Sequence, residues 1–87
     1  WGTHTHIATA DETILPGGTG YITDLGMCGA HAGVLGVSTE AILHKYLVKT
    51  TVQFTPAEGD VQLHGALFTI DEKTGRCTAA ARVAEAV

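Results

Sequence analysis

Hydrophobic residues recur with a helical period in one segment of the chain, "STEAILHKYLVK" at residues 38–49. Ser38 belongs to the residue types that cap helix N-termini, and Glu40 suits the positive first turn. The apolar positions share one side of such a helix and form a single stripe: Ile42, Leu43, Tyr46 and Leu47. The pattern therefore predicts one helix whose stripe packs on a sheet.

The clearest β pattern lies near the C-terminus. "GDVQLHGALFTI" and "RCTAAARV" are joined by "DEKTG", where Gly75 can adopt the positive φ that a hairpin turn requires. Apolar residues on both faces of the first arm predict a strand covered on both sides, in an interior or near-edge place in its sheet. Shorter extended segments are expected at residues 1–8, 20–25 and 50–54. The fold class is therefore α/β, with four or five strands and one helix.

Residues 9–37 are rich in glycine and form, by this pattern, a long loop threaded by the expected strand at 20–25. Loops of this length are usually functional. Asp24 precedes Gly26 by two residues, and we expect its carboxylate to accept hydrogen bonds from loop amides.

Composition narrows the function. The 87 residues suit one small domain, and nine acids against five scattered bases give a net charge of −4. The sequence has no cluster of Lys and Arg residues of the kind that binds duplex nucleic acid. No apolar window reaches the length of a membrane span, roughly 18 residues. Cys28 and Cys77 form no C-x-x-C motif and are expected to be buried, reduced thiols, which favours a cytoplasmic location.

The candidate chemistry lies at the start of the chain, in "WGTHTHIATADE". On a strand, His4 and His6 would point to the same face, close enough to bind one metal ion or one ion each of a pair. Imidazole suits Zn, Fe or Mn. The spacing permits a metal site, but a pair of half-exposed histidines on a strand would look the same.

The other polar candidates are weaker. His44 is expected on the solvated side of the helix, and His64 within a strand as a packed or hydrogen-bonded residue. Asp11 and Glu12 are most simply a solvated turn. A mononuclear metal site would combine His4 and His6 with one further ligand, and the residues available for that place are Asp11, Asp24 and His31.

Longer motifs carry a family resemblance. "GTHTH" followed by "TADETILPGGTGYITDLGM", and later "EGDVQL" and "IDEKTGR", resembles the C-terminal part of the YmdB-type family of calcineurin-like metallophosphoesterases. The resemblance runs through nearly the whole chain in order. It departs from the family pattern at "MCGAHAG", so no role is carried over to residues 28–33.

The resemblance implies an α/β fold in which residues 1–87 are the C-terminal portion of a β-sandwich flanked by helices and ending in a hairpin. It also implies two divalent metal ions, such as Fe or Mn, with His4 and His6 as ligands, one for each ion. The substrate class would be cyclic 2′,3′-nucleotides, hydrolysed by metal-bridged hydroxide attacking phosphorus. The remaining ligands would belong to an N-terminal part that is not in this sequence.

Three hypotheses result. The first is a piece of a bimetal phosphodiesterase that takes a small-molecule phosphodiester and associates into homo-oligomers. The second is a non-catalytic α/β fragment that acts as an interaction or self-associating module through open strand edges. The third is the mononuclear metal domain, which ranks last because no third ligand has a compelling position.

Overall fold

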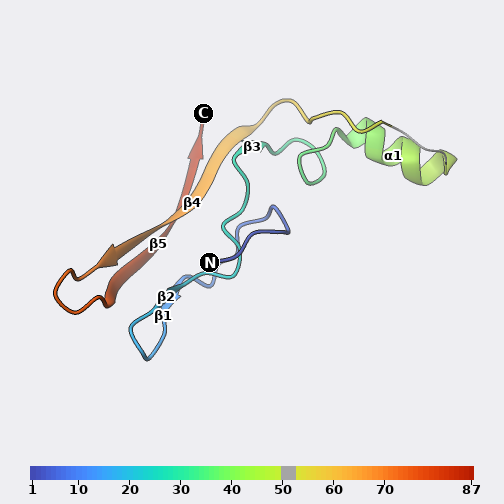
Figure 1. The fold of residues 1–87 in the computed structure, drawn as a ribbon. Helices are drawn as coiled ribbons and strands as arrows, with labels where there is room; N and C mark the ends of the chain where they lie inside the picture. The colour runs from blue at the N-terminus through green and yellow to red at the C-terminus, as the bar shows by residue number, and fades with distance from the viewer. Residues whose placement is uncertain (50–52) are drawn as a thin grey trace.

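A long antiparallel hairpin made of β4 (Val61–Ile70) and β5 (Cys77–Ala86) dominates the computed structural model, which describes residues 1–49 and 53–87 (Figure 1). β3 (Gly29–Ala30) pairs with the start of β4, so this sheet has the order β3-β4-β5. β1 (Thr13–Ile14) and β2 (Gly20–Tyr21) form a separate two-stranded antiparallel sheet. The single helix in the described residues is α1 (Thr39–Val48). The mixed α/β class is thus confirmed in outline, as two small sheets and one helix.

The hairpin forms where the sequence predicts it. Gly75 has a φ of 73° and donates its amide hydrogen to the Asp71 carbonyl, which closes the turn. From Gln62 paired with Ala86, the register runs regularly to a bulge between Thr69 and Ile70. One face of β4 and β5 carries Val61, Leu63, Leu67, Ala81 and Val83, and its two leucines are 47% and 63% exposed. The prediction that both faces are covered is therefore wrong for this chain.

Two of the shorter predicted strands are wrong or shortened. Residues 4–7 form a bend rather than a strand, and His6 there has a φ of 65°. The strand expected at 20–25 pairs only at Gly20 and Tyr21. The prediction for "TTVQF" falls partly on residues 50–52, outside the described residues, and Gln53 and Phe54 belong to no strand.

The helix is confirmed, with Ser38 as its N-cap: the Ser38 hydroxyl accepts a hydrogen bond from the Ala41 amide at 3.3 Å. The placement of its apolar stripe on a sheet is not what the structure shows. Figure 1 places the helix at one end of the molecule, away from the hairpin. Tyr46 and Leu47 are 71% and 78% exposed, and Ala41 is the buried residue of the helix.

The core is small. The buried apolar residues among those described are Ile22, Ala41 and Cys77. The radius of gyration is 17.1 Å, whereas a compact chain of this length has about 12 Å. Within the described ranges, no helix has the length and apolar character needed to cross a membrane.

The small sheet lies against β5. The Cys77 amide donates to the Gly18 carbonyl at 2.8 Å. A Cβ atom at Gly20 would lie 2.5 Å from Cδ1 of Phe68 and 2.7 Å from Sγ of Cys77, so only glycine allows this close approach. The ion pair between Arg82 and Glu12, at 3.0 Å, adds a second connection. These contacts fix the N-terminal segment on the hairpin.

Candidate metal centre

Residues 2–9 form a loop that is closed on the segment 23–25. The Leu25 amide donates to the Gly2 carbonyl at 3.0 Å, and the Thr9 amide donates to the Asp24 carbonyl at 3.1 Å. A Cβ atom at residue 2 would lie 2.5 Å from the Thr23 carbonyl oxygen, so the approach requires Gly2. The two candidate ligands lie inside this closed loop.

The carboxylate of Asp24 holds the inside of the loop. Its Oδ2 atom accepts from the amides of His4 and Thr5, at 3.0 and 2.8 Å, and from the Thr5 hydroxyl at 2.8 Å. Its Oδ1 atom accepts from the Gly26 amide at 2.8 Å. Asp24 is buried, with 3% of its surface exposed. The Gly26 amide first, and then Thr5, lower the pKa of Asp24 to about 2, so the group is an anion at neutral pH. The expectation that Asp24 binds loop amides is confirmed.

His6 is oriented by a second contact, from far along the chain. Its Nδ1 atom lies 2.9 Å from the Leu35 carbonyl oxygen. Because a carbonyl can only accept, Nδ1 carries the hydrogen, and the lone pair of the neutral ring is on Nε2. Leu35 and Gly36 have φ values of 53° and 85° in a turn closed by two hydrogen bonds between Val34 and Val37. Metal-bound histidines typically donate their other ring nitrogen to such a carbonyl.

The geometry of the pair differs from the one that the spacing predicts. His4 and His6 lie in a bend, so the alternation of a pleated strand does not set their directions. The His4 side chain is exposed and that of His6 is half-buried. The positive φ of His6 is uncommon outside glycine, though less so for histidine than for most residues. The loop held by Asp24 sets the positions of the two residues instead.

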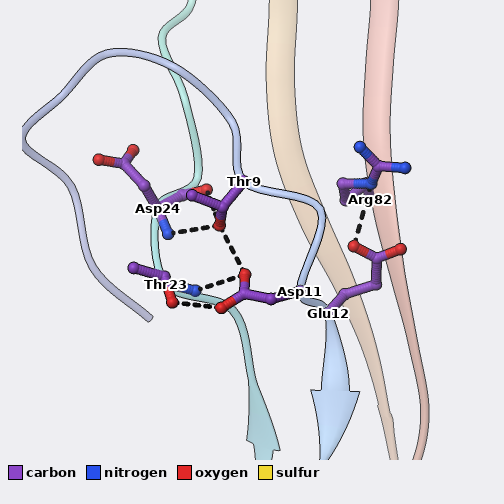
Figure 2. A network of polar contacts seen from close by, with 6 residues as sticks. All are labelled: Thr9, Asp11, Glu12, Thr23, Asp24 and Arg82. Atoms are coloured by element: carbon purple, nitrogen blue, oxygen red, sulfur yellow. Dashed lines mark hydrogen bonds and ion pairs between the residues drawn. The ribbon is translucent and has the colours of Figure 1, made fainter.

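The Asp11 carboxylate connects the segment after the histidine loop to Thr23 (Figure 2). Its carboxylate accepts from the Thr9 hydroxyl at 2.6 Å, from the Thr23 amide at 3.1 Å and from the Thr23 hydroxyl. The Thr23 hydroxyl first, and then Thr9, lower the pKa of Asp11 to about 2. Glu12 pairs with Arg82 on β5. The interpretation of Asp11 and Glu12 as a plain solvated turn is therefore wrong: both make structural contacts.

The remaining histidines make no hydrogen bond to this loop among the described residues, although His64 packs against Gly26 at its edge. The rings of His31 and His64 have centroids 4.4 Å apart and are tilted by 51° to each other. Nε2 of His31 contacts the Met27 carbonyl, and Nε2 of His64 contacts the Gln62 side chain. His44 is exposed on α1. In residues 1–49 and 53–87 no group of three His, Cys, Asp or Glu side chains is close enough to hold a metal ion. The structure thus offers no third ligand for the mononuclear hypothesis in that part of the chain.

Both cysteines are free. Cys77 is buried as expected, but Cys28 is exposed, and its thiol contacts the His64 carbonyl at 3.3 Å.

The contact between the His6 ring and the Leu35 carbonyl is one that the sequence does not predict. A backbone carbonyl has no side-chain signature, and only the tight turn at residues 34–37 brings it to the loop.

Comparison with known proteins decides the family. The model of the YmdB-like protein family matches residues 1–83. The chain belongs to this family. The family relatives include the 2′,3′-cyclic-nucleotide 2′-phosphodiesterase of Bacillus subtilis strain 168, which is 45% identical over 82 residues, or 94% of this chain and 31% of that protein. The chain thus spans about a third of the length of the curated relatives that it matches.

Two solved structures share the fold. The crystal structure of a hypothetical protein from Thermus thermophilus matches with a TM-score of 0.87 and 33% identity, over 97% of this chain and 32% of that one. The crystal structure of a novel phosphatase from Mycoplasma pneumoniae matches with a TM-score of 0.89 and 30% identity, over 97% and 30%. The arrangement of the 87 residues is therefore one that occurs within two longer chains of known structure.

The histidine loop fits part of a metal site. His6 has the tautomer in which Nε2 can ligate, set by the Leu35 carbonyl. His4 is exposed beside it, two residues away. Two imidazoles are fewer ligands than a zinc, iron or manganese site needs. The described residues could therefore supply only part of a ligand set, and a metal ion would need further ligands.

Proposed function

We propose that the chain supplies two ligands, His4 and His6, one for each ion of a dinuclear centre in a metal-dependent phosphodiesterase. The observation that carries this proposal is the His6 ring, whose Nδ1 hydrogen is engaged by the Leu35 carbonyl so that Nε2 is left to bind a cation. The family and the name of the Bacillus subtilis relative support phosphodiester hydrolysis, and cyclic 2′,3′-nucleotides as substrate class.

The role of this chain is to hold and orient the two imidazoles. Asp24 fixes the backbone on the His4 side, and Leu35 fixes the ring of His6. Two divalent ions, when bound, would supply positive charge against the phosphoryl oxygens and would lower the pKa of a bound water molecule to about 7. A chain with a net charge of −4 can in this way serve an anionic substrate without a basic surface.

We also propose that residues 1–87 are the C-terminal part of one metallophosphoesterase domain, whose N-terminal part supplies the other ligands and further layers of a β-sandwich. The small core, the 17.1 Å radius of gyration and the exposed leucines of the hairpin support this, since such a surface is more stable when covered. Iron and manganese are the proposed metals. A cytoplasmic location and homo-oligomerisation complete the proposal, and the two free thiols support the former.

The test is to express the complete reading frame that encodes this chain, with and without the changes His4→Ala and His6→Ala. After loading with manganese or iron, each protein is offered a cyclic 2′,3′-nucleotide and a chromogenic phosphodiester. We expect hydrolysis by the unchanged protein and a loss for each variant that exceeds the roughly 10- to 100-fold typical of residues that only orient a metal ligand. His44→Ala, on the exposed side of α1, is the matched control and retains activity. Full activity in His4→Ala and His6→Ala would overturn the assignment.

A second candidate function is an interaction or self-associating module. The exposed leucines of β4, Leu63 and Leu67, favour it, because an apolar sheet face of this kind is a common contact surface. This function predicts that the 87-residue chain associates with itself at micromolar concentration and does not hydrolyse phosphodiesters. Analytical ultracentrifugation of the chain and the assay above separate the two candidates.

A further inference from the structure

We infer that Asp24 is a positioning residue of the metal centre: its carboxylate holds the backbone of His4 and Thr5 so that the two imidazoles stay in place, and it does not itself bind metal. This inference rests on the proposed function of His4 and His6.

The first step is to count the hydrogen bonds that the Asp24 carboxylate accepts. An ionised carboxylate has about four lone-pair sites. Asp24 receives four hydrogen bonds, three on Oδ2 and one on Oδ1, all between 2.8 and 3.0 Å. With 3% of its surface exposed, it also has little access to solvent ions. Oδ2 is therefore saturated by the loop, and the burial of the side chain limits the access of a cation to the one site that remains on Oδ1.

The second step concerns what the hydrogen bonds hold. Asp24 accepts hydrogen bonds from the amide and the hydroxyl of Thr5, the residue before His6. It also accepts one from the amide of His4. The Thr5 hydroxyl in turn accepts from the Ile7 amide at 3.2 Å. His6 is thus fixed on both sides, which keeps its backbone at a φ of 65°. A left-handed conformation is unfavourable for a non-glycine residue and persists only where its neighbours determine it.

The third step is that the same neighbourhood offers a matched control. Asp11 is a carboxylate of the same hydrogen-bond network, bonded to Thr9 and Thr23, although its side chain is exposed and that of Asp24 is buried. Thr9 also contacts Asp24, and Thr23 precedes it in the chain. The recorded bonds of Asp11 reach neither His4 nor His6. Removing the charge of Asp11 perturbs the fold beside the loop. It leaves in place the hydrogen bonds from His4 and Thr5 to Asp24, which we call the clamp.

The experiment compares Asp24→Asn with Asp11→Asn in the complete protein, using Mn²⁺ alone as the probe in calorimetric titration. An asparagine nitrogen cannot accept, so at least one of the four donors loses its partner, and the hydrogen bonds that remain lose the negative charge that strengthens them. We expect the Mn²⁺ dissociation constant of Asp24→Asn to rise about 10- to 100-fold, the effect usual for a residue that orients a metal ligand. Asp11→Asn should leave it unchanged within the error of the titration.

Amide hydrogen exchange in the metal-free protein gives a second readout. The amides of His4 and Thr5 should exchange faster in Asp24→Asn and at the unchanged rate in Asp11→Asn. If Asp24→Asn does not fold, Thr5→Val tests the same clamp by removing only the hydroxyl, and Thr5→Ser should restore both exchange protection and affinity for Mn²⁺. An Mn²⁺ affinity equally weakened in both asparagine variants would assign Asp24 a purely structural role and overturn the inference.

The two proposals fail in different ways. If His4→Ala and His6→Ala weaken Mn²⁺ binding but Asp24→Asn does not, the positioning role is wrong and the metal ligands stand. If none of the three changes Mn²⁺ affinity, the proposed function is wrong and the positioning role falls with it.

Discussion

The Nδ1 atom of His6 lies 2.9 Å from the carbonyl oxygen of Leu35, although 29 residues separate the two in sequence. The contact joins the histidine loop to a two-residue turn with left-handed residues at both central positions, Leu35 and Gly36. Orientation of the proposed ligand therefore depends on a segment that contains no metal ligand of its own.

The backbone of His6 gives a prediction about stability. His6→Gly and His6→Ala both remove the ring and its hydrogen bond, but only glycine adopts a φ of 65° without steric cost. We expect the glycine variant of the metal-free complete protein to be more stable than the alanine variant by about 1 kcal/mol. Urea denaturation measures the difference, and equal midpoints would show that the left-handed conformation is not kept in solution.

Asp11 gives a prediction about acid. Hydrogen bonds from Thr23 and Thr9 lower its folded pKa from 3.8 to about 2, so the folded state favours the ionised form. The contribution of Asp11 is fully present above pH 4 and is lost as the pH falls toward 2. Asp11→Asn should therefore be less stable than the unchanged protein at pH 5, and the difference should shrink by pH 2.5. Thermal unfolding at both pH values checks this; a gap that stays constant would contradict it.

The contact between the small sheet and the hairpin depends on Gly20. A Cβ atom there meets Phe68 and Cys77 at distances that side chains do not tolerate, so Gly20→Ala should destabilise the protein by about 1–3 kcal/mol. Gly17, three residues earlier, has no atom within 4 Å of its added Cβ, and Gly17→Ala is the control. Chemical denaturation of the two variants should give a large shift for Gly20 only. Similar shifts would point to a loss of glycine flexibility in general.

Leu67 tests whether the exposed hairpin face is covered in the complete protein. It is 63% exposed in this chain, where its replacement by serine removes little packing. If the rest of the domain covers β4, Leu67→Ser in the complete protein should cost about 2–3 kcal/mol. Lys73→Ser, in the exposed turn after β4, should be neutral within about 0.5 kcal/mol. A neutral Leu67→Ser would leave this face exposed and contradict the proposed sandwich.

The sequence predicts the elements that local patterns determine. The Ser38 cap and the turn at Gly75 act within a few residues, and both are confirmed. The alternation of Thr and His at residues 3–6 is typical of a strand. The segment instead forms a loop, because its backbone binds Asp24, about twenty residues away. The prediction for Asp24 succeeded because a carboxylate near a glycine is a known acceptor of loop amides.

Packing was harder to predict than the elements themselves. The apolar stripe of α1 and the outer face of β4 are clear in sequence, but what covers them depends on distant chain. In these 87 residues Leu47 and Leu67 face solvent. Periodicity shows which side of an element is apolar, and it does not show which partner lies there.

The turn at residues 34–37 has a practical consequence for anyone who modifies this protein. Because the Leu35 carbonyl holds the His6 ring, lengthening this turn by a single residue would rotate that oxygen away, even though the turn looks like an ordinary surface connection. An epitope tag or fluorescent label is better inserted after Lys73, where the chain is exposed and the described hydrogen bonds of the turn involve no histidine.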